Sequence, residues 1–287
     1  MSGGAGTTIE IGELSGTALS VLEGGATGGR ALTYRIGGRN TNATFAGNIQ
    51  EQNTGTATSY VKTGTGVWTL SGTGDWNGGT TIEQGTLKIT GAITCASATN
   101  VAPAATLQFS GGSLATDALN IASNALLTGN GTITGDLNND GTVLATTGGT
   151  LAVTGDVVNN GTMRIASRTA LSATGAFVNN GVLDLLTSSS GLPPNLENNG
   201  IVIDSTGLRV LAVSKSGSTF TLTVQGYIGH TYQLQQAASL TATWAPVGTA
   251  QLGTDPGNTP TAITPLTFTD AGGATGTQRF YRIAVTP

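Results

Sequence analysis

The chain is poor in charge, in aromatic residues and in the side chains that most often carry out chemistry. Only 9% of its 287 residues are charged and 5% are aromatic, whereas about 25% of the residues of an ordinary soluble domain are charged. It contains one histidine, His230, and one cysteine, Cys95. These two cannot supply the three or four ligands of a zinc site, and an intrachain disulfide is impossible. We expect Cys95 to be a small buried side chain.

The sequence also lacks the charge and hydropathy patterns of several partner classes. Eleven Lys and Arg stand against fifteen Asp and Glu, and no basic cluster occurs, so nucleic acid is excluded as a partner. No run of 18 apolar residues is present, so no membrane-spanning segment is expected. The first residues, Met1 to Gly6, lack the charged start and apolar stretch of a secretory signal. Either a signal has been removed from this chain, or export is expected to use another route.

Glycine, by contrast, is abundant, with 45 residues, and part of it recurs in a fixed pattern. An Asn-Asn-Gly corner, or its near copy Asn-Asp-Gly, ends at Gly141, Gly161, Gly181 and Gly200, at intervals of 20, 20 and 19 residues. A period near 20 residues is typical of a solenoid whose stacked coils bury a continuous core.

Aligning the coils on those glycines places apolar residues in columns: Leu137, Val157, Phe177 and Leu196; Val143, Met163, Leu183 and Val202; Leu151 and Leu171. Helical spacing is absent, so we predict an all-β fold with a parallel β-helix over residues 1–205 and Asn-Gly coils at 130–205. Asn tolerates left-handed backbone at corners and can hydrogen-bond from coil to coil. The Asn columns are therefore interpreted as structural, and alanine at Asn160 is expected to lower stability.

Residues 62–89 resemble a known family, the autotransporter-associated β-helix repeat. This repeat occurs in bacterial passenger domains and in large secreted proteins of Verrucomicrobia and Planctomycetes. The residues that fall on its pattern are Lys62, Gly64, Gly66, Leu70, Gly72, Gly78, Gly79, Thr80, Gly85, Thr86 and Leu87. The resemblance implies a stalk or scaffold outside the cell, and it leaves the function open.

The last part of the chain, residues 206–287, has a different pattern. Apolar residues alternate along 219–224, 232–235, 265–269 and 279–285, which predicts antiparallel strands of a small β-sandwich. The stretches 229–234 and 280–282 are similar to a module found near the C-termini of secreted verrucomicrobial proteins. We expect its core to contain Trp244, Phe268, Phe280 and Tyr281.

No motif for catalysis or metal binding is complete. Glycan-cleaving β-helices need converging acids and bases, but Asp136 and Asp156 stack without a neighbouring base and Ala176 follows them. His230 has no Gly-x-Ser-x-Gly elbow beside it. The segment 136–141 fits the opening of a calcium loop, yet Thr147 stands where the closing Glu is required. We predict no catalytic residue, no cofactor and no metal site.

These observations predict a non-enzymatic structural protein at the cell surface or outside the cell. Because a β-helix has two ends with unpaired backbone groups, residues 1–32 either cap one end or dock on a neighbouring copy. Head-to-tail docking would give a filament or surface layer, with the protein itself as partner. The alternative is an adhesin that binds surface glycans through exposed Trp68 or Trp76, although core packing is favoured for both. A polysaccharide lyase or hydrolase is the remote alternative.

Overall fold

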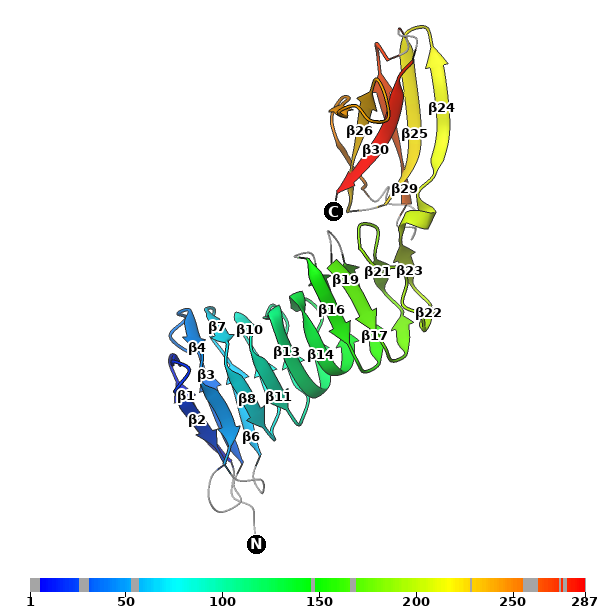
Figure 1. Ribbon diagram of the computed structural model, residues 1–287. Helices are drawn as coiled ribbons and strands as arrows, with labels where there is room; N and C mark the ends of the chain where they lie inside the picture. Colours follow the sequence, from blue (N-terminus) through cyan, green and yellow to red (C-terminus); the bar gives the residue numbers. More distant parts are fainter. Residues whose placement is uncertain are drawn as a thin grey trace. The chain divides into compact units, whose positions relative to one another are not determined.

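The computed structural model describes residues 6–25, 31–52, 57–145, 148–165, 169–227, 229–254, 263–273, 275 and 278–286. The chain divides into two compact units, Met1–Val202 and Ile203–Pro287 (Figure 1). Regular structure in the described residues is all β, apart from one 3-10 turn at Ser205–Gly207. The same residues contain no helix long and apolar enough to cross a membrane.

The first unit is a parallel β-solenoid, as predicted, and each full coil contributes one short strand to each of three sheets (Figure 1). The two long strands β13 (Thr106–Ile121) and β14 (Leu126–Asn139) each run through all three sheets. The first sheet also contains β1 (Thr7–Ile11), β3 (Leu32–Ile36), β6 (Thr58–Lys62), β9 (Thr80–Ile82), β12 (Thr99–Val101), β17 (Val157–Asn159), β20 (Phe177–Asn179) and β22 (Leu196–Asn198).

The other two sheets continue the same coils. The second contains β4 (Ala43–Phe45), β7 (Val67–Leu70), β10 (Thr86–Ile89), β15 (Thr142–Ala145), β18 (Thr162–Ile165), β21 (Val182–Asp184) and β23 (Ile201–Ile203). The third contains β2 (Val21–Gly24), β5 (Asn48–Glu51), β8 (Thr73–Trp76), β11 (Ala92–Cys95), β16 (Gly149–Val153) and β19 (Thr169–Ala173).

The strand register confirms the columns predicted from the 20-residue period. Val157 pairs with Leu137 on one side and with Phe177 on the other, and Leu196 continues the column. Met163 lies between Val143 and Leu183 in the same way. Alternate residues of each strand point inward, so these columns form one continuous apolar core along the solenoid.

The Asn-Gly corners do not use the left-handed backbone that Asn tolerates, because none of their Asn residues has a positive φ. Gly141, Gly161, Gly181 and Gly200 are absent from the residues with positive φ, so left-handed backbone does not explain them. A Cβ added at Gly161 would instead collide with the carbonyl oxygen of Gly141 in the preceding coil. The next glycine in the column meets the same obstacle, because each coil stacks directly on the backbone of the one before it.

The second unit is a small antiparallel β-sandwich. One sheet has the order β24 (Val210–Ser216), β25 (Thr219–Tyr227) and β29 (Ile263–Asp270). In the other, β26 (Thr231–Ala237) pairs along its length with β30 (Phe280–Thr286). The short strands β27 (Ala245–Pro246) and β28 (Gln251–Leu252) also pair with β26. The four alternating segments predicted from the sequence are thus β25, β26, β29 and β30.

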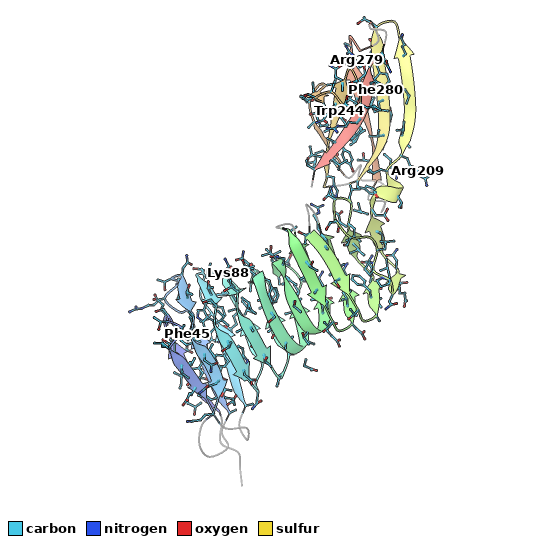
Figure 2. All side chains as sticks on the ribbon, in the orientation of Figure 1. Phe45, Lys88, Arg209, Trp244, Arg279 and Phe280 are labelled. Atoms are coloured by element: carbon cyan, nitrogen blue, oxygen red, sulfur yellow. The ribbon has the colours of Figure 1, made fainter. Side chains whose placement is uncertain are left out.

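The aromatic core expected for this unit is only partly correct (Figure 2). Phe268 is buried, and Tyr281 packs against the core while its ring stacks on Phe220 at 4.0 Å. Phe280 is one position out of phase with Tyr281 on β30, so it belongs to the other face of the strand. Trp244 is half-buried outside the core cluster and carries the Arg282 guanidinium 4.5 Å above its ring.

Candidate interaction surfaces

The inner Asn column is a structural ladder rather than a ligand site. Asn139, Asn159 and Asn179 are fully buried at the ends of β14, β17 and β20. Each side-chain amide donates to the side-chain oxygen of the Asn in the next coil at 2.7 Å, ending at Asn198. Each also donates to a backbone carbonyl, as Asn159 does to Val182 at 3.0 Å. These bonds satisfy polar groups that are inaccessible to water.

The two stacked acidic residues, Asp136 and Asp156, hold adjacent coils together through hydrogen bonds. Asp136 Oδ1 accepts the backbone N–H of Asp156 at 2.8 Å, and Asp156 Oδ1 accepts that of Ala176 at 2.8 Å. Within the calcium-like segment 136–141, Leu137 and Asn139 point into the core, so its side chains diverge to two sides of β14. Thr147 lies outside the described residues. Among those residues, no group of three or more His, Cys, Asp or Glu could hold a metal ion.

Lys62 was matched to the family pattern, but its burial was not foreseen from the sequence. It occupies an inward position of β6, in register with Ile36 and Ile82. Its side chain is 2% exposed, and its ammonium donates to the carbonyls of Thr63 and Gly64 at 2.7 Å and of Gln84 at 3.2 Å. Burial lowers the pKa of Lys62 to about 8. Side chains of a strand alternate between inward and outward, so the inward position of Tyr60 implies that Lys62, two residues later, also points inward.

The two tryptophans of the solenoid, the cysteine and the histidine are all buried. Trp68 and Trp76 are 3% and 1% exposed, so neither offers a stacking platform for a sugar. Cys95 is buried with its Sγ 3.0 Å from the Gly78 carbonyl oxygen, as expected for a structural thiol. His230 is fully buried within the second unit. None of these side chains is presented to a substrate.

At one end of the solenoid, no described residue covers the first coil, residues 6–25. Ile9 stands in the inward column above Tyr34 and Tyr60, yet it is 39% exposed because no described strand covers it. Leu19 and Val21 of the same coil are also exposed, at 93% and 55%. In the described part of the chain, β1 pairs only with β3 and β2 only with β5, so both strands keep a free edge.

The first coil is also acidic. It carries Glu10, Glu13 and Glu23 and has no Lys or Arg of its own. Glu10 forms an ion pair with Arg35 of the next coil at 3.1 Å but keeps 68% of its side chain exposed. Glu13 and Glu23 accept hydrogen bonds from Thr41 and Gln50. The first coil thus carries only negative charge of its own, while Arg35 and Arg39 of the next coil adjoin it at Glu10 and at Gly12.

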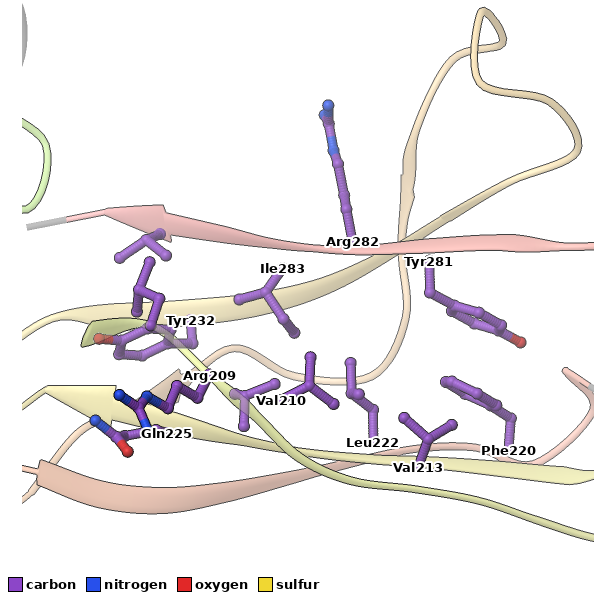
Figure 3. Close-up of a pocket in the computed structure, with 13 residues that line it drawn as sticks. Arg209, Val210, Val213, Phe220, Leu222, Gln225, Tyr232, Tyr281, Arg282 and Ile283 are labelled. Carbon is purple, nitrogen blue, oxygen red and sulfur yellow. The ribbon is translucent and has the colours of Figure 1, made fainter. Parts of the chain in front are cut away.

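The second unit contains an apolar groove of about 380 Å³ between its two sheets (Figure 3). Its walls come from β24 and β25 on one side and from β26 and β30 on the other, and include Val210, Val213, Leu222 and Ile283. In the close-up, Arg209 and Gln225 lie at one end and Phe220 and Tyr281 at the other, while Arg282 points away. Such a concave, largely apolar site is typical of a binding surface.

The groove is bordered by a free strand edge with positive charge. β24 pairs only with β25 among the described strands, and all seven of its residues are exposed. Val210, Leu211 and Val213 expose 61%, 51% and 61% of their surface. Arg209 and Lys215 flank them, and neither has an ion-pair partner in the described residues.

Comparison with known proteins agrees with the solenoid. The family described as passenger-associated-transport-repeat matches residues 61–89, which contain β7, β8, β9 and β10 and all of the residues on which the sequence resemblance rests. No curated protein and no solved structure matches the chain. The match covers one coil and its borders, and it is consistent with a passenger-like β-helix at the cell surface.

Proposed function

We propose that this protein is a non-enzymatic structural component, located at the cell surface or outside the cell, that assembles with itself head to tail. The observation that carries the proposal is the uncovered first coil. There an inward apolar column ends in solvent at Ile9, beside the free edges of β1 and β2. A free strand edge exposes backbone N–H and C=O groups and is a template for pairing with another chain.

A contact between this end and a different surface of another copy would be heterologous. A heterologous contact that does not close into a ring propagates as a fibre. The low content of charged residues, 9%, also means that little electrostatic repulsion opposes close packing of copies. A filament or surface layer is therefore the expected product.

The non-enzymatic part of the proposal is supported by the positions of the residues that could do chemistry. Asp136 and Asp156 each accept a backbone N–H of the next coil, and His230 is fully buried. The passenger-associated repeat supports secretion or display at the cell surface. An adhesin that binds glycans is the alternative, but Trp68 and Trp76, its expected platforms, lie in the core.

Assembly is tested by electron microscopy and light scattering of the purified chain over a range of concentrations at neutral pH. We expect filaments or a mass that rises with concentration. Ile9→Lys, which places a charge in the free end, should abolish the increase. Thr94→Lys, which adds the same charge on the exposed face of β11, should leave it unchanged. A wild-type chain that stays monomeric at every concentration would overturn the proposal. The adhesin alternative would then be tested next, by a glycan-binding screen.

A further inference from the structure

We propose that the surface that receives the first coil is the β24 face of another copy, that is, strand β24 with the groove beside it. This inference rests on the proposed self-assembly and names the two surfaces that meet. The occupant of the groove is then a second copy of this chain. Three independent features of the described residues support the pairing: apolar exposure, charge and free strand edges.

Six of the exposed large apolar side chains belong to two segments of the chain. Nine such residues are exposed in the described chain; three lie on the first coil (Ile9, Leu19, Val21) and three on β24 (Val210, Leu211, Val213). The other three, Leu192, Leu240 and Leu252, are apart from both groups in the sequence. Leu19 is the most exposed of the nine, at 93%, and is the side chain that would enter the groove.

The two segments that would meet carry opposite charges. Residues 6–25 contain three Glu and no Lys or Arg, whereas residues 205–225 contain Arg209 and Lys215 and no Asp or Glu. A second copy therefore presents the charge that complements the β24 face. Complementary charges of this kind steer association and select the partner surface, and the effect weakens as salt rises.

The free edges are also compatible. β1 is five residues long and β24 is seven, and each pairs on one side only in the described part of the chain. Adding a strand across such edges satisfies exposed backbone N–H and C=O groups while side-chain pockets provide specificity. The groove of about 380 Å³ lies next to β24 and would take the apolar side chains of the incoming coil.

A charge-swap experiment with full-length chains tests the pairing. One variant carries Arg209→Glu and Lys215→Glu, so both of its surfaces are acidic. The other carries Glu13→Lys and Glu23→Lys, so both are basic. At low salt each variant alone should assemble at least about tenfold more weakly than the wild type, because like charges now meet. An equimolar mixture should recover assembly, since every junction again joins opposite charges.

The control is Asp75→Lys, a charge reversal at an exposed position of β8 in the middle of the solenoid. It should leave assembly unchanged. Circular dichroism of each variant establishes that it is folded before assembly is measured. Light scattering and electron microscopy then give the extent of assembly at low and high salt.

The outcomes separate this inference from the proposed function. Wild-type filaments that neither charge variant weakens would overturn the β24 pairing and leave self-assembly standing. Assembly lost only in the Arg209→Glu, Lys215→Glu variant, with no rescue on mixing, would show that the charge of the first coil plays no part in the junction and would also overturn the inference. A monomeric wild type would overturn both. Recovery in the mixture alone supports the junction as proposed.

Discussion

Replacing Asn159 by alanine tests whether the buried ladder stabilises the solenoid. Asn159 is fully buried, and its side chain takes part in three hydrogen bonds. Its amide donates to Asn179 Oδ1 at 2.7 Å and to the Val182 carbonyl at 3.0 Å. Its oxygen accepts from Asn139 Nδ2 at 2.7 Å. Alanine removes all three at once.

The size of the effect follows from the groups left behind. The Asn179 side-chain oxygen loses a donor at a buried site, and the Val182 carbonyl loses one at a partly buried site. Each such loss costs about 1–3 kcal/mol, with the carbonyl toward the lower value because water can partly replace the bond. Asn139 loses less, because its amide still reaches the Thr162 carbonyl at 3.2 Å. We therefore expect Asn159→Ala to lower the free energy of unfolding by about 3–5 kcal/mol.

The adjacent residue provides a matched control. Asn160 belongs to the outer column, where its amide donates to Asp140 at 2.8 Å and its oxygen accepts from Asn180 at 2.8 Å. These bonds are exposed, so water can replace them, and Asn160→Ala should cost less than about 1 kcal/mol. The loss of stability expected from the sequence at Asn160 should thus be small, with the large effect one residue earlier.

Equilibrium urea unfolding of the full chain, followed by circular dichroism, measures both variants. For slopes of about 1–3 kcal/mol per molar urea, the Asn159→Ala midpoint should fall by at least about 1 M, and the Asn160→Ala midpoint should barely move. Equal shifts for the two variants would refute the reasoning, because they would show that burial does not decide the strength of the ladder.

Three further predictions concern the solenoid. Gly161→Ala should lower the free energy of unfolding by about 1–3 kcal/mol, because the new Cβ meets the backbone of the preceding coil. Gly191→Ala, whose new Cβ has nothing within 4 Å, should leave the free energy of unfolding unchanged in the same urea titrations. Burial lowers the pKa of Lys62 from 10.5 to about 8, so between these pH values the unfolded chain binds more protons than the folded chain. The free energy of unfolding of the wild type should therefore rise relative to that of Lys62→Met as the pH goes from 8 to 10.5. A constant or falling difference between the two chains in urea titrations would contradict this. The buried Cys95 thiol should react with a thiol reagent only in urea, and rapid modification of the native chain would show that the core at β11 is accessible.

The local pattern of the chain determined the architecture. The spacing of the Asn-Gly corners identified the coils, because a solenoid repeats its backbone and must repeat the residues that its backbone tolerates. The columns through Val157 and Met163 followed from the same spacing. Alternation likewise identified β25, β26, β29 and β30, since side chains of a strand point to opposite faces in turn.

Other features depended on contacts between coils or between sheets, and the spacing of residues along the sequence does not indicate such contacts. Only the stacked structure showed that Gly161 is required by the carbonyl beneath it and that Lys62 lies inside the core. The same holds for Trp244, which an aromatic pattern assigned to the core and the second unit leaves beside Arg282. The sequence determined which residues repeat, whereas tertiary packing decided which of them are buried and which surfaces stay uncovered, because burial depends on neighbours distant in the chain.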